Sequence, residues 1–198
     1  VRNRVRDVAE ASILERVQLT AMTALDERVN ALHDEDRIRA TFAMALAKHP
    51  RVLVLDLAYR AEAGSTYPVY SQLVQRLARD GSLTIVVCTD SLAVAADVAD
   101  DVLVTLDGCP VEYGSVYDIC LRPAMPYVQA LLRVTPSPHR ALPDFNSFVD
   151  LARREGCPWV LNCKADVVRA CSHVPPALTP VAPGHAAACH LLGGADVA

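Results

Sequence analysis

The stretch "RIRATFAMALAKHPRVLVLD", residues 37–56, places the pattern of a helix directly before the pattern of a buried strand. Apolar and small side chains recur on one side of a helix over residues 37–48, and Pro50 ends it. The run "VLVLD" at 52–56 is apolar and β-branched and closes on a carboxylate, which is typical of a strand buried in a parallel sheet. This junction therefore predicts an α/β fold.

Further strands and helices alternate after this junction. Buried-strand patterns recur at 83–88 and 101–108, and a helical pattern that Pro68 can begin fills 68–79 between two strands. Such alternation is typical of a parallel sheet covered by helices. The other expected elements are a helix at 4–19, a helix at 91–99 with Ser91 as its N-cap, a hairpin strand at 109–114, and short helices at 115–120 and 126–134.

Composition and charge narrow the class of protein. The chain has 198 residues, of which 52% are hydrophobic, and a formal net charge of −4. It has no cluster of Lys and Arg, which argues against nucleic acid as a partner. The first residues do not resemble a signal peptide, and no apolar run is long enough to cross a bilayer. The sequence therefore predicts a cytosolic protein, in which clustered cysteines more often bind metal or do redox chemistry than form disulfides.

Composition also divides the chain into three parts. Residues 1–134 carry the α/β pattern, and residues 135–156, which include "TPSPHRALPDFN", are expected to be a proline-rich linker. Residues 157–192 are expected to form a separate, loop-rich tail that holds four of the seven cysteines.

The four cysteines of the tail follow the spacing C-x5-C-x7-C-x17-C. Four thiolates satisfy either one tetrahedral zinc ion or the four irons of a [4Fe–4S] cluster. Free cysteines also occur as small buried apolar side chains, but a tail so rich in proline has little core in which to bury them. A metal centre would supply the folding energy that the tail lacks. The candidate ligands are Cys157, Cys163, Cys171 and Cys189.

The other cysteines and the histidines of the tail are expected to play lesser roles. Three cysteines fall in or beside predicted elements, where packing is the expected role: Cys88, Cys109 and Cys120. Three histidines flank the candidate ligands and are expected to be solvated loop residues, with replacement of one ligand as the alternative: His173, His185 and His190.

Together these segments resemble the C-terminal half of an ABC transporter ATPase subunit, of the branch that imports oligopeptides, dipeptides and nickel. Residues 37–56 resemble the family's signature helix leading into its Walker B strand. The segment "TDSLAVAADVADDVLVTLDGCPVEYGSVYDI" at 89–119 is similar to its switch-loop helix, last core strand and hairpin. "MPYVQALL" at 125–132 and the cysteine tail resemble motifs of the importer branch, and the resemblance runs from about residue 11 to residue 192.

The resemblance implies a site for Mg-ATP at which several positions differ from the family pattern. Asp56 aligns with the Walker B aspartate, which holds Mg²⁺, and is retained. Leu57 stands where the family has its catalytic glutamate, a positioned base that contributes roughly 10²–10⁴-fold to a rate. Asp90 aligns with the switch histidine that donates to the γ-phosphate, and a carboxylate cannot donate. Ala63 stands for the D-loop aspartate.

The signature motif of the family also differs here. Its small residues let backbone N–H groups at a helix N-terminus approach the γ-phosphate. The aligned segment is "LHDEDRIR", in which His33, Asp34 and Glu35 replace a serine and two glycines. We expect these carboxylates to complement the dipole of the helix that follows and not to bind ATP.

The chain has no GxxxxGK[ST] phosphate loop, and its first residue, Val1, falls in the middle of the domain that the resemblance implies. We therefore expect either a fragment of a longer subunit, or a subunit whose first half is missing or encoded elsewhere.

The resemblance implies a degenerate, non-hydrolysing portion of the nucleotide-binding domain of an importer for peptides or similar small solutes. Its partners would be transmembrane permease subunits and a second ATP-binding domain, on the cytoplasmic face of the cell membrane. The tail of this branch is associated with a [4Fe–4S] cluster, which favours iron over zinc. Two alternatives stay open: a stand-alone iron–sulfur or zinc module for sensing or structure, and a truncated gene product without activity.

Overall fold

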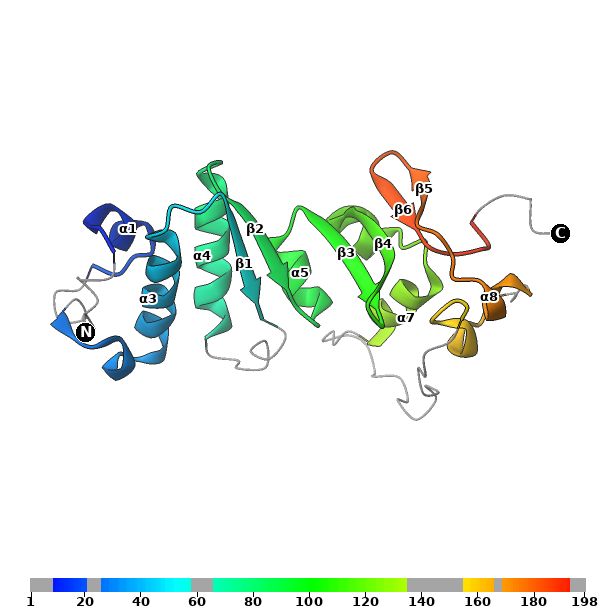
Figure 1. Cartoon of the computed structure of the whole chain (residues 1–198), viewed down its shortest axis with the longest axis horizontal. Helices are drawn as coiled ribbons and strands as arrows, with labels where there is room; N and C mark the ends of the chain where they lie inside the picture. The colour runs from blue at the N-terminus through cyan, green and yellow to red at the C-terminus, as the bar shows by residue number, and fades with distance from the viewer. Residues whose placement is uncertain (1–8, 21–25, 58–65, 135–154, 166–168, 193–198) are drawn as a thin grey trace. The chain divides into compact units, whose positions relative to one another are not determined.

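The computed structural model describes residues 9–20, 26–57, 66–134, 155–165 and 169–192 (Figure 1). The chain divides into two compact units, residues 1–98 and residues 99–198. Within the described ranges, no helix is both long enough and apolar enough to cross a membrane.

The first unit is built around two parallel strands. β1 (Val52–Asp56) pairs with β2 (Thr84–Cys88) in a register that sets Asp56 opposite Cys88. Helix α4 (Tyr67–Arg79) connects the two strands, with Pro68 in its first turn, where no backbone N–H is needed. The other helices of this unit are α1 (Ala11–Arg16), the 3₁₀ helix η2 (Val29–Ala31), α3 (Asp34–Leu46) and α5 (Leu92–Val98).

One face of the β1–β2 sheet is covered and the other is open. Leu53 of β1 belongs to a buried core that also contains Phe42 of α3 and Leu73 of α4. On the opposite face the apolar side chains are exposed: Val52 by 54%, Val54 by 62% and Val86 by 44%. The strands of this unit are therefore buried on one side only.

A polar contact joins α4 to α5. The Tyr67 hydroxyl donates to Oδ2 of Asp97 at 2.8 Å, and the Ser71 hydroxyl donates to the same oxygen at 2.5 Å. These hydrogen bonds, that of Ser71 first, hold the pKa of Asp97 below its ordinary value of 3.8. Desolvation by burial, together with the bond to Asp97, raises the pKa of Tyr67 to about 12.

Replacing Asp97 with asparagine is expected to lower the stability of the first unit by less than about 1 kcal/mol, because solvent screens an exposed carboxylate. Because the pKa of Asp97 is lower in the folded than in the unfolded chain, the carboxylate stabilises the fold at pH values above its unfolded-state pKa of 3.8. This stabilisation is lost as the pH falls through the folded-state pKa. Thermal unfolding of both proteins between pH 7 and pH 2 should show a gap that closes in acid. The exposed Asp100→Asn variant serves as the control, and a gap that widens in acid would contradict this role.

The second unit contains a four-stranded sheet in the order β3-β4-β6-β5. The hairpin of β3 (Asp101–Leu106) and β4 (Cys109–Ser115) is extended by β6 (His185–Ala187) and β5 (Thr179–Ala182), and all three pairings are antiparallel. The helices of this unit are α6 (Val116–Leu121), α7 (Pro126–Val134), the 3₁₀ helix η4 (Val160–Asn162) and α8 (Ala170–His173).

Most of the elements expected from the sequence are present within one to three residues. The Ser91 hydroxyl accepts from the Val94 backbone N–H at 3.4 Å, so the predicted N-cap of α5 is confirmed. Only residues 9–19 of the predicted helix at 4–19 are described, and α1 covers six of them. Residues 135–154 of the predicted linker also lie outside the described residues.

Two expectations about the sheets were wrong. The predicted third parallel strand, β3, pairs antiparallel with β4 and lies in a different sheet from β1 and β2. The cysteine tail, expected to be a separate appendage, contributes β5 and β6 to the same sheet as β3 and β4. A strand pattern in the sequence predicts which side chains are buried. It does not predict which strand will be the partner, and this explains both differences.

Candidate functional site

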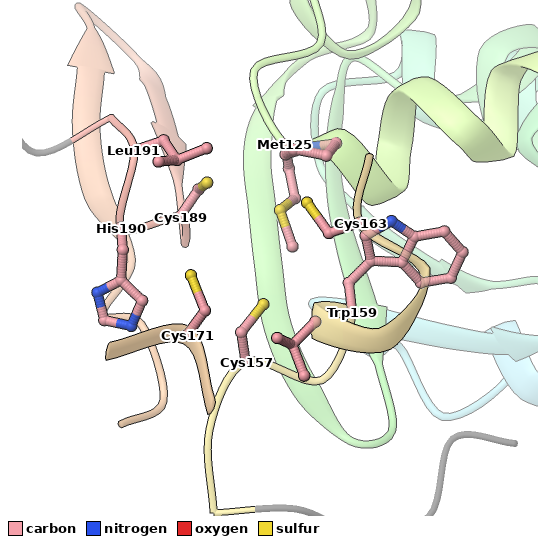
Figure 2. Close-up of a pocket in the computed structure, with 10 residues that line it drawn as sticks. Met125, Cys157, Trp159, Cys163, Cys171, Cys189, His190 and Leu191 are labelled. Atoms are coloured by element: carbon pink, nitrogen blue, oxygen red, sulfur yellow. The ribbon is translucent and has the colours of Figure 1, made fainter. Parts of the chain in front are cut away.

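The four cysteines of the tail line a single pocket in the second unit. Figure 2 shows their sulfur atoms directed toward a common space. Cys157 and Cys171 are buried, whereas Cys163 and Cys189 are partly exposed. The structure thus brings together the four residues that the sequence analysis chose as ligands, from segments up to 32 positions apart in the chain.

Backbone contacts hold two of these cysteines side by side. The Cys157 N–H donates to the Cys171 carbonyl at 2.8 Å, at the point where α8 begins. Gly156 permits this approach, because a Cβ built there would lie 2.3 Å from the same carbonyl oxygen. Cys163 follows the 3₁₀ helix η4, and Cys189 comes two residues after β6 ends.

The start of α7 and one aromatic contact form another wall of the pocket. Met125 and Pro126 line it, together with Trp159. The Trp159 ring meets the ring of Tyr127 edge-on, with centroids 5.0 Å apart, and burial raises the pKa of Tyr127. The tail therefore packs against α7 through apolar and aromatic groups around its thiols.

Burial affects two thiols of this pocket. It raises the pKa values of Cys157 and Cys189, and the neighbouring thiols raise them further. Metal binding requires thiolates and releases these protons. Among the described residues, no group of three or more His, Cys, Asp or Glu side chains is arranged to hold a metal ion.

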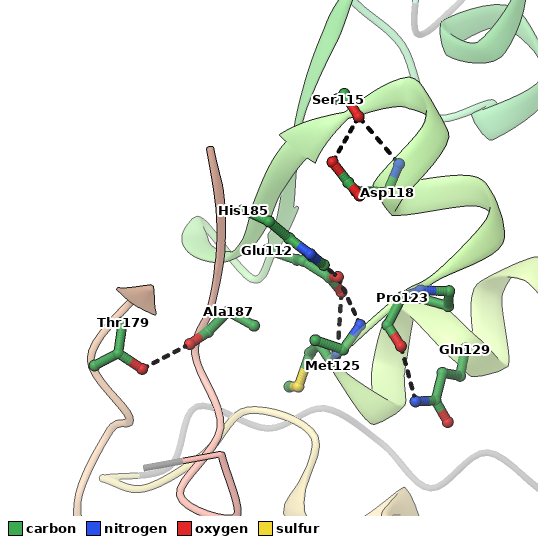
Figure 3. Close-up of polar contacts among 10 residues, drawn as sticks. Glu112, Ser115, Asp118, Pro123, Met125, Gln129, Thr179, His185 and Ala187 are labelled. Atoms are coloured by element: carbon green, nitrogen blue, oxygen red, sulfur yellow. Dashed lines mark hydrogen bonds and ion pairs between the residues drawn. The ribbon is translucent and has the colours of Figure 1, made fainter. Parts of the chain in front are cut away.

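A buried carboxylate lies next to this pocket, and the sequence analysis missed it. Glu112 of β4 is fully buried, and its Oε1 lies 2.7 Å from Nε2 of His185 on β6 (Figure 3). It also accepts the backbone N–H groups of Ala124 at 2.7 Å and Met125 at 3.0 Å. The expectation that His185 is a solvated loop residue was therefore wrong, since it is only 5% exposed.

The other tail histidines and cysteines have different surroundings. His190 lines the pocket, and its Nε2 lies 2.9 Å from the Val174 carbonyl oxygen, whereas His173 is exposed. The expectation that Cys88 and Cys109 pack in the interior was wrong, because both are exposed, while Cys120 is partly buried. Side chains alternate in exposure along β2, and Cys88 is at an exposed position. Cys109 lies beside the hairpin turn.

The positions that align with an ATP site lie in the first unit. Asp56 closes β1 and is exposed, and Asp90 is exposed two residues after β2. Leu57 is only 5% exposed, and its N–H donates to the Cys88 carbonyl at 2.8 Å. The carboxyl ends of two parallel strands thus present two carboxylates and a buried leucine, and Ala63 lies outside the described residues.

The acidic segment before and within α3 is exposed. His33 is the N-cap residue without a side-chain capping bond, and three acidic residues occupy the first turn. Asp34 forms an ion pair with Arg37, and Glu35 is exposed. Carboxylates in a first turn stabilise the helix dipole, so this helix end carries negative charge where a phosphate would require positive potential.

No family model matches the chain, but curated proteins do. A probable peptide ABC transporter ATP-binding protein from Sinorhizobium fredii is 31% identical over 186 residues, which cover 89% of this chain and 55% of that protein. A glutathione import ATP-binding protein from Salmonella choleraesuis is 35% identical over 131 residues, which cover 65% of this chain and 21% of that protein. The chain thus spans about half the length of the first relative and less of the second.

A solved structure has a similar fold. The crystal structure of the ADP conformation of an ATP-binding cassette of an ABC transporter aligns with a TM-score of 0.50 and 16% identity, over 60% of this chain and 47% of that chain. At this identity the likeness concerns the fold alone. The Sinorhizobium match leaves only about a tenth of the chain outside it, so it extends past Cys171 into the tail.

Proposed function

Because the chain belongs to the family of ABC transporter ATP-binding proteins, we propose that it is a non-hydrolysing portion of the nucleotide-binding domain of an importer for peptides or similar small solutes. The observation that carries this proposal is the burial of Leu57 at the end of β1. A leucine has no lone pair with which to orient water, and here its side chain is directed into the protein. Of the two adjacent residues, only Asp56 carries a group suited to Mg²⁺.

The chemistry of the surrounding positions supports the same proposal. A carboxylate at Asp90 accepts hydrogen bonds and cannot donate one to a phosphate. Asp34 and Glu35 add negative charge and side-chain bulk at the helix end where backbone N–H groups would approach a triphosphate. Each change works against binding of a triphosphate.

The partners and organisation of the chain follow from this proposal. Transmembrane permease subunits and a second ATP-binding domain would complete the transporter, with the chain on the cytoplasmic face of the membrane. Hydrolysis would then take place in the partner domain. In this proposal residues 1–134 are the ATPase-derived part, 135–156 are a linker, and 157–192 are a metal-binding tail that shares a sheet with β3 and β4.

In the tail, Cys157, Cys163, Cys171 and Cys189 would hold a [4Fe–4S] cluster. The donor set fits, because four cysteines and no carboxylate line one pocket. When bound, the cluster would cross-link the segments that carry the four cysteines and would stabilise the tail. The residues of this chain supply the enclosure: Met125, Pro126 and Trp159 exclude water from one side.

The resemblance of the tail to that of the importer branch favours a cluster over zinc, the alternative metal. Four thiolates bound about 2.3 Å from one zinc ion lie within roughly 4 Å of one another. A [4Fe–4S] cluster takes one thiolate at each of its four irons, so its thiolates lie farther apart than those around one zinc ion.

The purified chain is expected to release phosphate from Mg-ATP no faster than buffer alone, and Asp56→Asn should leave that rate unchanged. Leu57→Glu alone should restore nothing, because Asp90 still lacks a donor. A phosphate-release assay over a range of ATP concentrations checks both statements. Hydrolysis that disappears in Asp56→Asn and persists in the exposed Asp101→Asn variant would contradict the proposal.

A further inference from the structure

The buried pair of Glu112 and His185 joins three segments of the second unit (Figure 3). Glu112 lies on β4, His185 on β6, and the two backbone N–H groups that Glu112 accepts belong to the residues just before α7. One carboxylate therefore contacts the ATPase-derived hairpin, the tail and the start of α7 at once.

Two of these segments lead directly into the pocket. Met125, whose N–H donates to Oε2 of Glu112 at 3.0 Å, also lines the pocket with its side chain. Cys189 lies four residues after His185 along the same extended segment. The position of the carboxylate thus affects one wall of the pocket and one of its four thiols.

The pairing that holds β6 against β4 is short. Its pairing with β4 consists of Glu112↔Ala187 and Tyr113↔Ala186, followed by the Ala188 N–H, which donates to the Val111 carbonyl at 2.8 Å. The His185 ring packs over Gly114, where an added Cβ would lie 3.1 Å from the ring. The fit over this glycine and the pairing with Glu112 together fix the orientation of the histidine.

We propose that Glu112 and His185 are positioning residues that hold Cys189 and Met125 at the pocket, so that formation of the thiol site depends on a residue outside the cysteine segment, Glu112. Cys157 and Cys171 do not depend on this pair, because a direct backbone bond joins them. The expected effect on metal binding rests on the proposed metal site. The positioning of Cys189 itself can be measured without metal.

The test compares Glu112→Gln and His185→Leu with the unchanged chain and with Thr179→Val. The control removes a hydrogen bond of the same hairpin, from the Thr179 hydroxyl to the Ala187 carbonyl at 3.2 Å, and leaves the buried pair intact. Alkylation of each cysteine in the metal-free protein is followed by mass spectrometry, with the exposed Cys88 as an internal standard. Iron and sulfide per chain are then measured after anaerobic reconstitution.

Both single variants are expected to speed alkylation of Cys189 roughly tenfold, as local opening would, while Cys157 and Cys171 keep their rates. The double variant should add little to either single change, because both remove the same contact. Iron per chain should fall in the variants and not in Thr179→Val. An unchanged Cys189 rate overturns the inference, and so does equal acceleration of all three thiols, which would mean a general loss of folding.

The two proposals fail in different ways. If the unchanged chain takes up neither iron nor zinc, the metal site is wrong, and the alkylation rates still decide whether the pair positions Cys189. If iron is taken up equally by the unchanged chain and by both variants, the metal site stands and the dependence on Glu112 is wrong.

Discussion

Protein purified without oxygen and carrying serine at both Cys157 and Cys163 is expected to contain less than about a tenth of the iron and inorganic sulfide of the unchanged chain, because two of four ligands are lost and a serine oxygen is a poor replacement for thiolate. The brown colour of the unchanged protein should disappear in parallel. Iron and sulfide analysis together with visible absorbance measures the effect.

The matched control is the triple variant in which Cys88, Cys109 and Cys120 become serine. It removes three thiols, none of which lines the pocket, and should keep the full iron content. Colourless protein with one zinc per chain, lost on the Cys157 and Cys163 changes, would replace the cluster with a structural zinc site. Equal metal content in all three proteins would show that the pocket thiols hold no metal.

Replacing Gly156 with alanine is expected to have the largest effect of any single methyl group added to the tail. The new Cβ would lie 2.3 Å from the Cys171 carbonyl oxygen and 2.8 Å from the His173 backbone nitrogen. Backbone atoms cannot rotate away, so relief requires the two segments to separate, at a cost of about 1–3 kcal/mol. The hydrogen bond from Cys157 to Cys171 should break, and alkylation of both thiols should accelerate.

Gly184→Ala provides the comparison for this change. It also adds a methyl group to a tail glycine, but nothing lies within 4 Å of the new atom. Its positive φ of 74° brings backbone strain without a clash. This variant should unfold at a lower temperature than the unchanged chain and still keep the slow alkylation of Cys157. If Cys157 reacts equally fast in the two variants, Gly156 is not needed to hold Cys157 at the pocket.

Local patterns in the sequence were enough to predict most individual elements and the cysteine set. Apolar runs at 52–56 and 83–88 have the composition of buried strands, and both are strands, although only one face of their sheet is covered. The partner of β3 could not be predicted in the same way, because its alternating burial fits either sheet. Sheet membership depends on contacts between distant residues, which a local pattern does not encode.

The cysteines of the candidate site were predicted from the sequence, but the residues that hold them in place were not. Cysteines stand out because of their rarity and spacing. Glu112 does not, because it is one of many acidic residues in the chain and lies on a short strand. One signal was present: a charged residue in the otherwise apolar and small run "PVEYG" on a hairpin strand. Buried charges are paired or hydrogen-bonded, so a predicted inward-facing glutamate calls for a partner, and His185 lies 73 positions away.

The open face of β1 and β2 bears on any measurement of the stability of this chain. Burying a valine side chain completely is worth roughly 1.5–3 kcal/mol, and Val52, Val54 and Val86 are each about half exposed. Whatever comes to cover that face would therefore add several kcal/mol. A melting temperature obtained for the chain by itself is a lower bound on the value for the first unit inside an assembly that shields these valines.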